Sequence, residues 1–313
     1  MKKYGFGADV GGTTIKMGLF EMDGTLVEKW EIPTDTTEKG AHILQDIAAT
    51  VHGKMVENDL TKDMVEGIGI GVQGAVDKDG VVNRAVNLGW DIVPLAEELG
   101  KLSGMKVKVG NDANVAALGE NWMGSGKGYN SIVMVTLGTG IGGGIIIDGN
   151  ILTGANGAAG EIGHIVVNEQ EIEACNCGHY GCIEQYASAT GIVRMAKRAL
   201  AGTSEDSKLR TFGEAVSAKD VFDCARAGDK VACDVVDQVC GMLGATLAKI
   251  GCVVNPDAFI IGGGVSRAGQ ILIDALQEPF KAQVFHACKD TPIVLATLGN
   301  DAGIYGAVRM LLS

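Results

Sequence analysis

"SIVMVTLGTGIGGGIIIDGN", residues 131–150, is two apolar runs joined by a glycine-rich turn. The first run, SIVMVTL, is typical of a buried strand, and IIID after the glycines is strand-like too. The turn itself, GTGIGG at 138–143, matches the spacing GxGxxG of dinucleotide sites. That motif requires a helix after the turn, so that a pyrophosphate meets the helix N-terminus. Because a strand follows here, the stretch predicts a β-hairpin with a glycine tip and argues against a Rossmann fold.

The same plan occurs near the start of the chain. YGFGADV at 4–10 reads as an alternating strand, GGTT as a turn and IKMGLFE as a second strand that leads into an Asp-Gly turn. The order of strand, glycine turn, strand and Asp-Gly turn is therefore present twice. This weak internal repeat predicts two halves built on one plan.

Strands and helical patterns alternate along the rest of the chain, which predicts an α/β fold. Apolar residues recur every fourth position from Ile43 to Met55, so we expect a helix over 40–58. Further helices are predicted near 184–201, 217–227 and 230–252, and a closing helix at DAGIYGAVRMLL, 301–312.

The composition limits the function. The chain has 313 residues and a net charge of −12, and an acidic surface repels the backbone of nucleic acids. A nucleoside triphosphate is not excluded, since backbone N–H groups and Mg²⁺ usually bind it. No secretory signal is recognised, and the apolar run at 131–147 is interrupted by glycines. We therefore expect a cytoplasmic protein that binds neither nucleic acid nor membrane, and whose thiols stay reduced.

"CNCGHYGCIE", residues 175–184, places three cysteines within eight positions. A reducing compartment argues against a disulfide. Three thiolates and one imidazole form a closed tetrahedral zinc site of the structural kind. Cys175, Cys177 and Cys182 are the candidate thiolates, while spacing leaves His164 and His179 both open as the fourth ligand. The other five cysteines are scattered and predict small buried residues.

Glycine tips expose N–H groups to a phosphate chain. The hairpin at 138–140 shares this property with the turn at 11–13 and with GGGVS at 262–266. A single tip is compatible with a plain tight turn, but three together favour nucleotide binding. The candidate nucleotide-binding residues are Gly11, Gly12, Thr13, Gly138, Thr139, Gly140, Gly262, Gly263 and Gly264, together with Asp9 beside the first tip.

Asn111 and Asp112 stand where a predicted strand, KVKVGND, ends and a helix begins. The carboxyl edge of an α/β sheet is where ligands bind, which makes Asp112 a candidate general base. Asn and Asp are also preferred helix N-caps, so the bare sequence leaves both interpretations open.

These motifs resemble a known superfamily. DVGGT (9–13), TLGTGIGGG (136–144), IIGGGVS (260–266) and AGIYGAV (302–308) resemble the phosphate, adenosine and connecting motifs of sugar kinases, actin and heat-shock ATPases. The cysteine run has the form CxCGxxGCxE and, with EIGH at 161–164, resembles the signature of the ROK family of repressors and kinases. The resemblance implies two ribonuclease-H-like α/β lobes around a cleft.

The resemblance also implies roles for single residues. Asp112 would deprotonate a sugar 6-hydroxyl, and Asp9 would help to hold Mg²⁺ against the ATP phosphates. His164 would complete the zinc site with the three cysteines. The implied sugar-binding residues are Gly74, Asn87, Asn111, Asp112, Glu161, His164 and Glu184. Many kinases of the family have Pro at the position of Gln73, which makes the backbone there less predictable.

The expected activity is phosphorylation of glucose by ATP, because NLGW at 87–90 resembles the glucokinase branch. A kinase for another hexose (N-acetylmannosamine, allose or mannose), polyphosphate as donor, and a sugar-responsive repressor without its DNA-binding domain are the alternatives. We expect a small lobe of residues 1–111 with about 298–313, a large lobe of 112–297, and, from the family alone, a homodimer.

Overall fold

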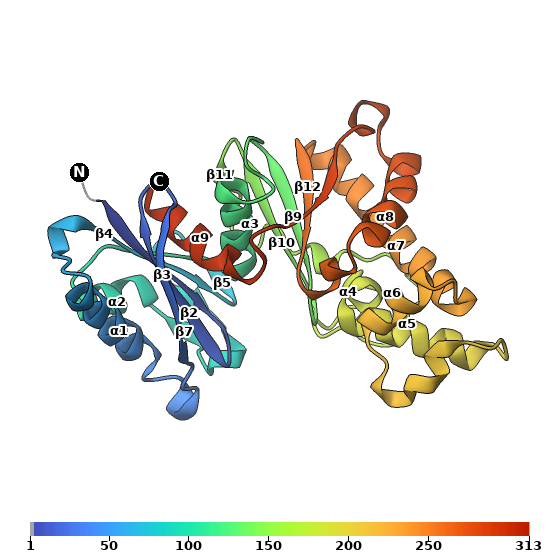
Figure 1. Cartoon of the computed structure of the whole chain (residues 1–313), viewed down its shortest axis with the longest axis horizontal. Helices are drawn as coiled ribbons and strands as arrows, with labels where there is room; N and C mark the ends of the chain where they lie inside the picture. Colours follow the sequence, from blue (N-terminus) through green and yellow to red (C-terminus); the bar gives the residue numbers. More distant parts are fainter. Residues whose placement is uncertain (1–2, 313) are drawn as a thin grey trace. The chain divides into compact units, whose positions relative to one another are not determined.

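The computed structural model describes residues 3–312 and divides into two compact units (Figure 1). Unit 1 comprises Met1–Asn130, Gly144–Gly160 and Thr297–Ser313. Unit 2 comprises Ser131–Gly143 and Glu161–Ala296. The chain therefore passes between the units four times, once inside the second predicted hairpin.

Unit 1 is built on a five-stranded sheet of order β3-β2-β1-β4-β8. β1 (Tyr4–Val10), β2 (Thr14–Glu21) and β3 (Leu26–Pro33) form an antiparallel meander. β4 (Val65–Val72) and β8 (Val107–Asn111) follow in parallel with β1. The carboxyl ends of β1, β4 and β8 thus meet at one edge, which is the edge predicted to carry ligands.

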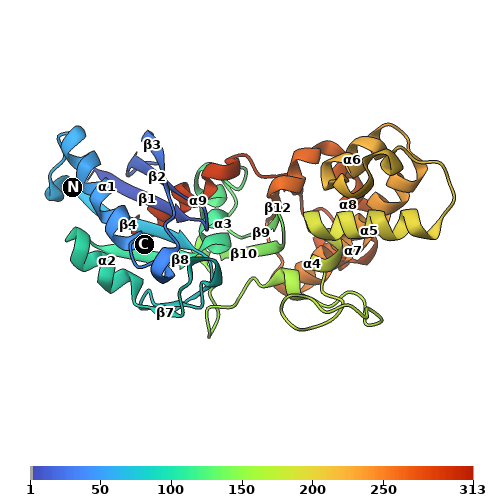
Figure 2. The same ribbon diagram turned by 90° about the horizontal axis from the view of Figure 1, so that it is seen from below.

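Helices cover the two faces of this sheet. α1 (Ile43–Glu57) and α2 (Leu95–Ser103) bury their apolar side chains in one core with the even-numbered residues of β1. α9 (Ala302–Arg309) packs on the other face beside α3 (Asp112–Met123), as Figures 1 and 2 both show. Strand side chains alternate between faces, so one strand serves both layers.

Two glycines explain how close α9 lies to its neighbours. A Cβ atom on Gly69 of β4 would be 1.8 Å from the carbonyl oxygen of Ala307, and one on Gly306 would be 1.7 Å from that of Val115. Only glycine fits at either position. A part of the high glycine content therefore serves helix packing inside regular elements and not turns.

A small antiparallel sheet follows β4 in the same unit. It consists of β5 (Ala75–Val76), β6 (Val82–Asn83) and β7 (Ile92–Val93).

The second large sheet has the order β11-β10-β9-β12-β13. β9 (Ile132–Leu137), β12 (Ala258–Gly262) and β13 (Ile293–Leu295) run in parallel. β10 (Ile141–Ile147) and β11 (Asn150–Ile151) form a hairpin. A strand and not a helix follows the glycine turn at 138–140, which confirms the argument against a dinucleotide fold.

The remaining helices belong to unit 2. They are α4 (Glu184–Ala187), α5 (Ala189–Gly202), α6 (Ala218–Arg226), α7 (Lys230–Val254) and α8 (Gln270–Gln283). Among the described residues, α7 alone is long and apolar enough to cross a membrane by length and composition, but 61% of its apolar window is buried. It packs against other helices of unit 2, as a core helix does.

The prediction of an α/β fold is confirmed. Sequence periodicity predicts one helix over 184–201, whereas the structure breaks it at Ser188 into α4 and α5. The two units also differ from the predicted lobes in two respects. Gly144–Gly160 lies in unit 1, whereas the predicted range of 112–297 places it with the large lobe. α3 lies in unit 1, because it packs along α9, whereas the predicted boundary at residue 111 places it with the large lobe.

Candidate functional site

Asp9 lies near the carboxyl end of β1, directly before the first glycine turn. Its side chain is largely buried, and this burial raises its pKa from 3.8 to about 6, although the charge of Lys16 acts in the opposite direction. The charge of Asp112 raises this pKa further, so the two carboxylates are neighbours within unit 1. A Cβ atom on Gly303 would lie 2.7 Å from Asp9 Oδ2, so the start of α9 closes over the carboxylate.

Asn111 ends β8, and Asp112 begins α3. Asn111 Oδ1 accepts hydrogen bonds from the N–H groups of Ala113 at 3.1 Å and Asn114 at 3.2 Å, so Asn111 is the helix N-cap. Its Nδ2 donates to the carbonyl oxygen of Gly74 at 3.1 Å. Burial raises the pKa of Asp112, against the hydrogen bond that it accepts from the N–H group of Ala113. The capping interpretation is thus correct for Asn111, and it leaves Asp112 as the carboxylate available for chemistry.

The segment after β4 joins the same edge. Gly74 has a φ of +101°, a conformation that favours glycine. Asn87 Nδ2 donates to Gln73 Oε1 at 2.7 Å, so Gln73 orients Asn87. A Cβ atom on Gly12 of the first turn would lie 3.5 Å from Asn87 Cβ. Unit 1 therefore brings its predicted site residues together: Asp9, Gly11, Gly12, Thr13, Gly74, Asn87, Asn111 and Asp112.

The second and third glycine turns lie side by side in unit 2. Gly138–Gly140 connects β9 to β10, and Gly262–Gly264 begins with the last residue of β12, the parallel neighbour of β9. Gly263 has a φ of +81°, and its Cβ atom would lie 2.6 Å from the backbone of Leu137 at the end of β9. The backbone contact explains why glycine stands there.

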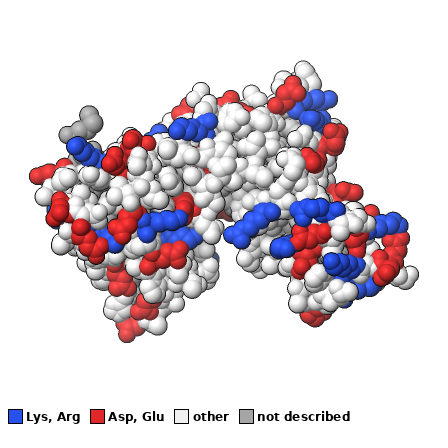
Figure 3. All heavy atoms as spheres, viewed as in Figure 1, with Lys and Arg blue, Asp and Glu red and all other residues white. Residues whose placement is uncertain are grey.

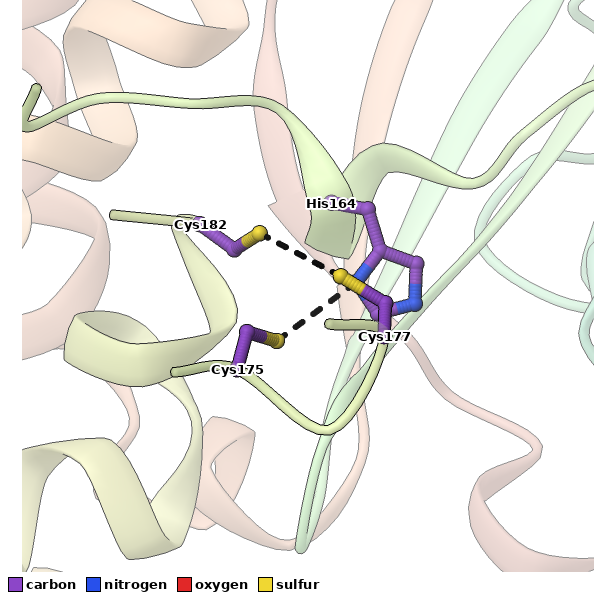
Figure 4. Close-up of side chains that lie close together, drawn as sticks. All are labelled: His164, Cys175, Cys177 and Cys182. Atoms are coloured by element: carbon purple, nitrogen blue, oxygen red, sulfur yellow. Dashed lines mark hydrogen bonds between the residues drawn. The ribbon is translucent and has the colours of Figure 1, made fainter. Parts of the chain in front are cut away.

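The predicted metal site is also in unit 2. One ligand atom each of His164, Cys175, Cys177 and Cys182 lies within 4.8 Å of all the others. Figure 4 shows the four side chains pointing toward one another. His164 Nδ1 is 3.8 Å from Cys175 Sγ, and the sulfurs of Cys177 and Cys182 are 3.6 Å apart. His179, the rival ligand, lies with its Nδ1 3.6 Å from Cys177 Sγ but outside this group of four.

Side chains from α4 and α5 hold the loop that carries Cys175, Cys177 and Cys182, here called the cysteine loop. Gln185 Oε1 accepts from the N–H groups of Gly181 at 2.8 Å and Cys182 at 3.1 Å. Glu171, nearly fully buried, accepts from Tyr186 Oη at 2.7 Å and from both terminal nitrogens of Arg198 at 2.9 and 3.0 Å. Arg198 is the main reason that the pKa of Glu171 lies well below its usual range.

The two predicted glutamates differ in their surroundings. Glu161 is exposed, with its Oε2 3.9 Å from His164 Nε2. Glu184 begins α4, and its Oε2 accepts from the N–H group of Ile141 at 2.8 Å, directly after the second glycine turn. Its Oε1 lies 3.8 Å from Cys175 Sγ. Glu184 therefore stands between the glycine turn and the cysteine cluster.

Sequence patterns did not identify Glu120 or Asn114 of α3. Glu120 is fully buried and accepts from the N–H groups of Thr297 at 3.2 Å and Leu298 at 2.7 Å, where the chain re-enters unit 1. Asn114 borders a pocket of about 840 Å³ in unit 1 that also reaches Asn111. Within residues 3–312, its Oδ1 is buried without a hydrogen-bond partner. The signal in the sequence is the second asparagine three positions after the predicted helix start at Asn111, in the first turn of α3.

Comparison with known proteins identifies the family. The model of the ROK family matches residues 5–313. The chain belongs to the ROK family. It is 43% identical to a glucokinase of Halalkalibacterium halodurans over 96% of this chain and 92% of that protein. It is 39% identical to a glucokinase of Thermotoga maritima over 97% and 96% of the two chains.

A solved relative agrees in fold. The structure of a ROK family glucokinase from Streptomyces griseus in complex with glucose and AMPPNP has a TM-score of 0.77 and 36% sequence identity. It covers 98% of both chains. The actin-like ATPase fold implied by the sequence motifs is therefore confirmed, and so is the resemblance to the ROK family.

Proposed function

We propose that this ROK protein transfers the γ-phosphoryl group of ATP to the 6-hydroxyl of glucose. The observation that carries the proposal is that the carboxylates of Asp112 and Asp9 are neighbours at the carboxyl edge of the unit 1 sheet, beside a glycine turn. Phosphoryl transfer needs a base at the nucleophile and charge stabilisation at the phosphates. The relative from Streptomyces griseus, solved with glucose and AMPPNP, supports both substrates.

Asp112 acts as the general base. Burial raises the pKa of its carboxyl group, which brings it closer to the value at which a base works best at neutral pH. The side-chain amide of Asn111 is fixed, because Oδ1 accepts from the N–H group of Ala113 and Nδ2 donates to the carbonyl oxygen of Gly74. The direction of the second Nδ2 hydrogen is fixed with it. Asn111 therefore offers a positioned donor to a sugar hydroxyl, with Gly74 and Asn87 beside it.

The three glycine turns bind the nucleotide, and Asp9 fits a place beside Mg²⁺. The ordinary chemistry of Mg²⁺ is octahedral binding to oxygen with several retained waters. Asp9 supplies a largely buried carboxylate oxygen, and burial raises its pKa against the weaker effect of Lys16. Mg²⁺ would neutralise charge on the ATP phosphates. Asp9 would help to hold this ion.

The cluster of three thiols and one imidazole fits structural zinc. Its donor set leaves no open coordination position, and the loop that carries it contains little regular secondary structure. His164, Cys175, Cys177 and Cys182 would hold the ion. Bound zinc would fix the loop and keep Glu161, His164 and Glu184 in place as the sugar-binding residues of unit 2. Metal analysis of the purified protein should give about one zinc per chain, and His164→Ala should lower this value, whereas His179→Ala should not.

Charge on the surface is mixed. On the face in Figure 3, Lys and Arg side chains are interspersed with Asp and Glu. We propose that the protein acts in the cytoplasm without nucleic acid, as a homodimer. A kinase for N-acetylmannosamine, allose or mannose, a polyphosphate-dependent kinase, and a sugar-responsive regulator are the alternatives that the family permits.

The deciding experiment measures ADP release with ATP-Mg²⁺ against a panel of hexoses. Turnover on glucose that disappears in Asp112→Ala is the expected result. Turnover confined to another hexose would keep the mechanism and change the substrate. Turnover with polyphosphate alone would change the donor. Sugar binding without turnover would favour the regulator.

A further inference from the structure

The first glycine turn is held from one side by Thr34, the residue directly after β3. Thr34 Oγ1 donates to the carbonyl oxygen of Gly11 at 2.7 Å, and its N–H group donates to that of Thr13 at 2.9 Å. In the described part of the chain, the N–H group of Gly12 makes no hydrogen bond. Thr34 thus donates hydrogen bonds to two carbonyl oxygens of the turn, while the N–H group of Gly12 stays available to a ligand.

The second turn is held in the same way by the start of α5. The N–H group of Ala189 donates to the carbonyl oxygen of Gly138 at 2.8 Å, and Thr190 Oγ1 donates to that of Thr139 at 2.7 Å. Across residues 3–312, no hydrogen bond engages the N–H groups of Thr139 and Gly140.

The geometry of the peptide group connects the occupied oxygens to the free donors. A peptide unit is planar, with its C=O and N–H groups pointing in opposite directions. The carbonyl of Gly11 and the N–H group of Gly12 belong to one such unit, and so do the carbonyl of Thr139 and the N–H group of Gly140. A threonine hydroxyl that pins the oxygen on one side therefore fixes the direction of the N–H group on the other.

We propose that Thr34 and Thr190 are positioning residues that hold the N–H groups of Gly12 and Gly140 in the orientation that binds the phosphates of ATP. The inference rests on the proposed function, since it takes the nucleotide phosphate as the anion. A glycine turn without the pinned oxygens can rotate its peptides and present carbonyl oxygens, which repel phosphate. The two units use the same device, although Thr34 follows a strand and Thr190 lies in a helix.

The test replaces each threonine by valine, which keeps the shape and removes the hydroxyl. Thr34→Val and Thr190→Val should each weaken the binding of ATP-Mg²⁺, measured calorimetrically without sugar, by about threefold to tenfold, the loss of one ordinary hydrogen bond. Adenosine, which has no phosphate, should bind as it does to the wild type. The KM for glucose should stay within about twofold, because the hydroxyls face the turns and not the sugar residues.

Matched variants separate positioning from a general loss of structure. Thr34→Ser and Thr190→Ser keep the hydroxyl and should restore ATP affinity. Thr211→Val is the control, since Thr211 Oγ1 also donates to a backbone carbonyl, that of Lys208 at 2.7 Å, far along the chain from either turn. It should leave every constant unchanged.

Three results would overturn the inference. Unchanged ATP affinity in both valine variants would do so, and so would equal losses for ATP and adenosine. If Thr34→Val does not fold and Thr34→Ala does not either, Thr34 has a structural role and the inference fails for the first turn. If these results are found while the wild type phosphorylates glucose, the proposed function stays intact. If the wild type binds no ATP, the proposed function and the positioning role of the threonines are both overturned.

Discussion

Asp9 in unit 1 is a largely buried carboxylate and Glu171 in unit 2 a nearly fully buried one, but their surroundings are opposite. Glu171 accepts hydrogen bonds from Tyr186 and Arg198 and also pairs with Arg194, and its pKa lies well below the usual range. Asp9 is left with burial as the main influence, which raises its pKa to about 6 against the weaker effect of Lys16.

The difference shows which carboxylate supports structure and which is kept for chemistry. A buried charge with well-placed partners is satisfied and makes its surroundings rigid, whereas removal of one partner is strongly destabilising. A buried carboxylate that lacks such compensation has a raised pKa and gains from a cation or a proton, as functional carboxylates do. Glu171 braces the cysteine loop, while Asp9 and Asp112 are ready to act on a ligand.

The largest effect is expected at Asp112. Asp112→Asn keeps the size and the helix start but removes the base, so kcat should fall by about 10³-fold, within the usual range for a general base. Because the carboxylate is not part of a compensated network, the thermal unfolding temperature should stay near that of the wild type. Steady-state kinetics on glucose and a melting curve measure both. A large loss of stability with little loss of kcat would place Asp112 with the bracing carboxylates and break the comparison.

The second-largest effect is expected at Arg198, the partner of Glu171. Arg198→Met removes the bidentate partner of Glu171 and leaves Arg194, so the free energy of local opening of 166–198 should fall by about 2 kcal/mol. Hydrogen exchange of peptides from this segment reports that opening, and peptides of unit 1 provide the internal reference.

Lys219→Met is the matched control for Arg198→Met. Lys219 pairs with Asp223 at 2.5 Å on the exposed surface of α6, where such pairs contribute little. Hydrogen exchange should be unchanged in this variant. An equal effect in both variants would mean that the Glu171 network is no more than a surface ion pair.

Local patterns predicted much of this molecule. The apolar run SIVMVTL predicted β9, because such residues suit buried strands, and apolar residues at every fourth position predicted α1. The cysteine spacing identified Cys175, Cys177 and Cys182, since three thiols in one short loop have few other uses. Helix α4–α5 was predicted as one element, because the apolar periodicity continues across Ser188, whose side chain accepts from the N–H group of Gly191 and starts a new helix.

Contacts between distant segments were not predictable from the sequence. Glu120 meets Thr297, and Glu171 meets Arg198, across separations that carry no period or spacing. The sequence also left His164 and His179 open as ligands, and only the folded loop groups His164 with the thiols. Whether a polar residue is exposed, capping or buried in a network depends on the tertiary neighbours that folding supplies.

The third-largest effect is the loss of the contribution of Glu171 to stability at low pH. The pKa of Glu171 is lowered in the folded state, so its contribution to stability is present above its ordinary value of 4.5 and is lost as the pH falls below it. Exchange protection of 166–198 should therefore decrease from pH 6 toward pH 3.5 in the wild type. Glu171→Gln should be less stable at pH 6 and should lose less protection over the same range. Parallel pH profiles for the two proteins would contradict this role of Glu171.

The smallest effect has the opposite sign and belongs to Asp9. Its raised pKa means that the protonated form is favoured in the folded state, so its contribution to stability is complete below 3.8 and is lost as the pH rises through about 6. At pH 7.5 the wild type holds a buried, incompletely compensated charge that Asp9→Asn lacks. The variant should therefore be more stable by about 1 kcal/mol, a value discounted for partial solvent access, and the gap should close toward pH 4. Denaturant unfolding without nucleotide or Mg²⁺ measures this difference in the free energy of unfolding. ATP-Mg²⁺ should reduce the difference, because a cation stabilises the wild-type carboxylate. A variant that is less stable than the wild type at pH 7.5 would show that Asp9, like Glu171, supports the fold, and the contrast between the two units would be lost.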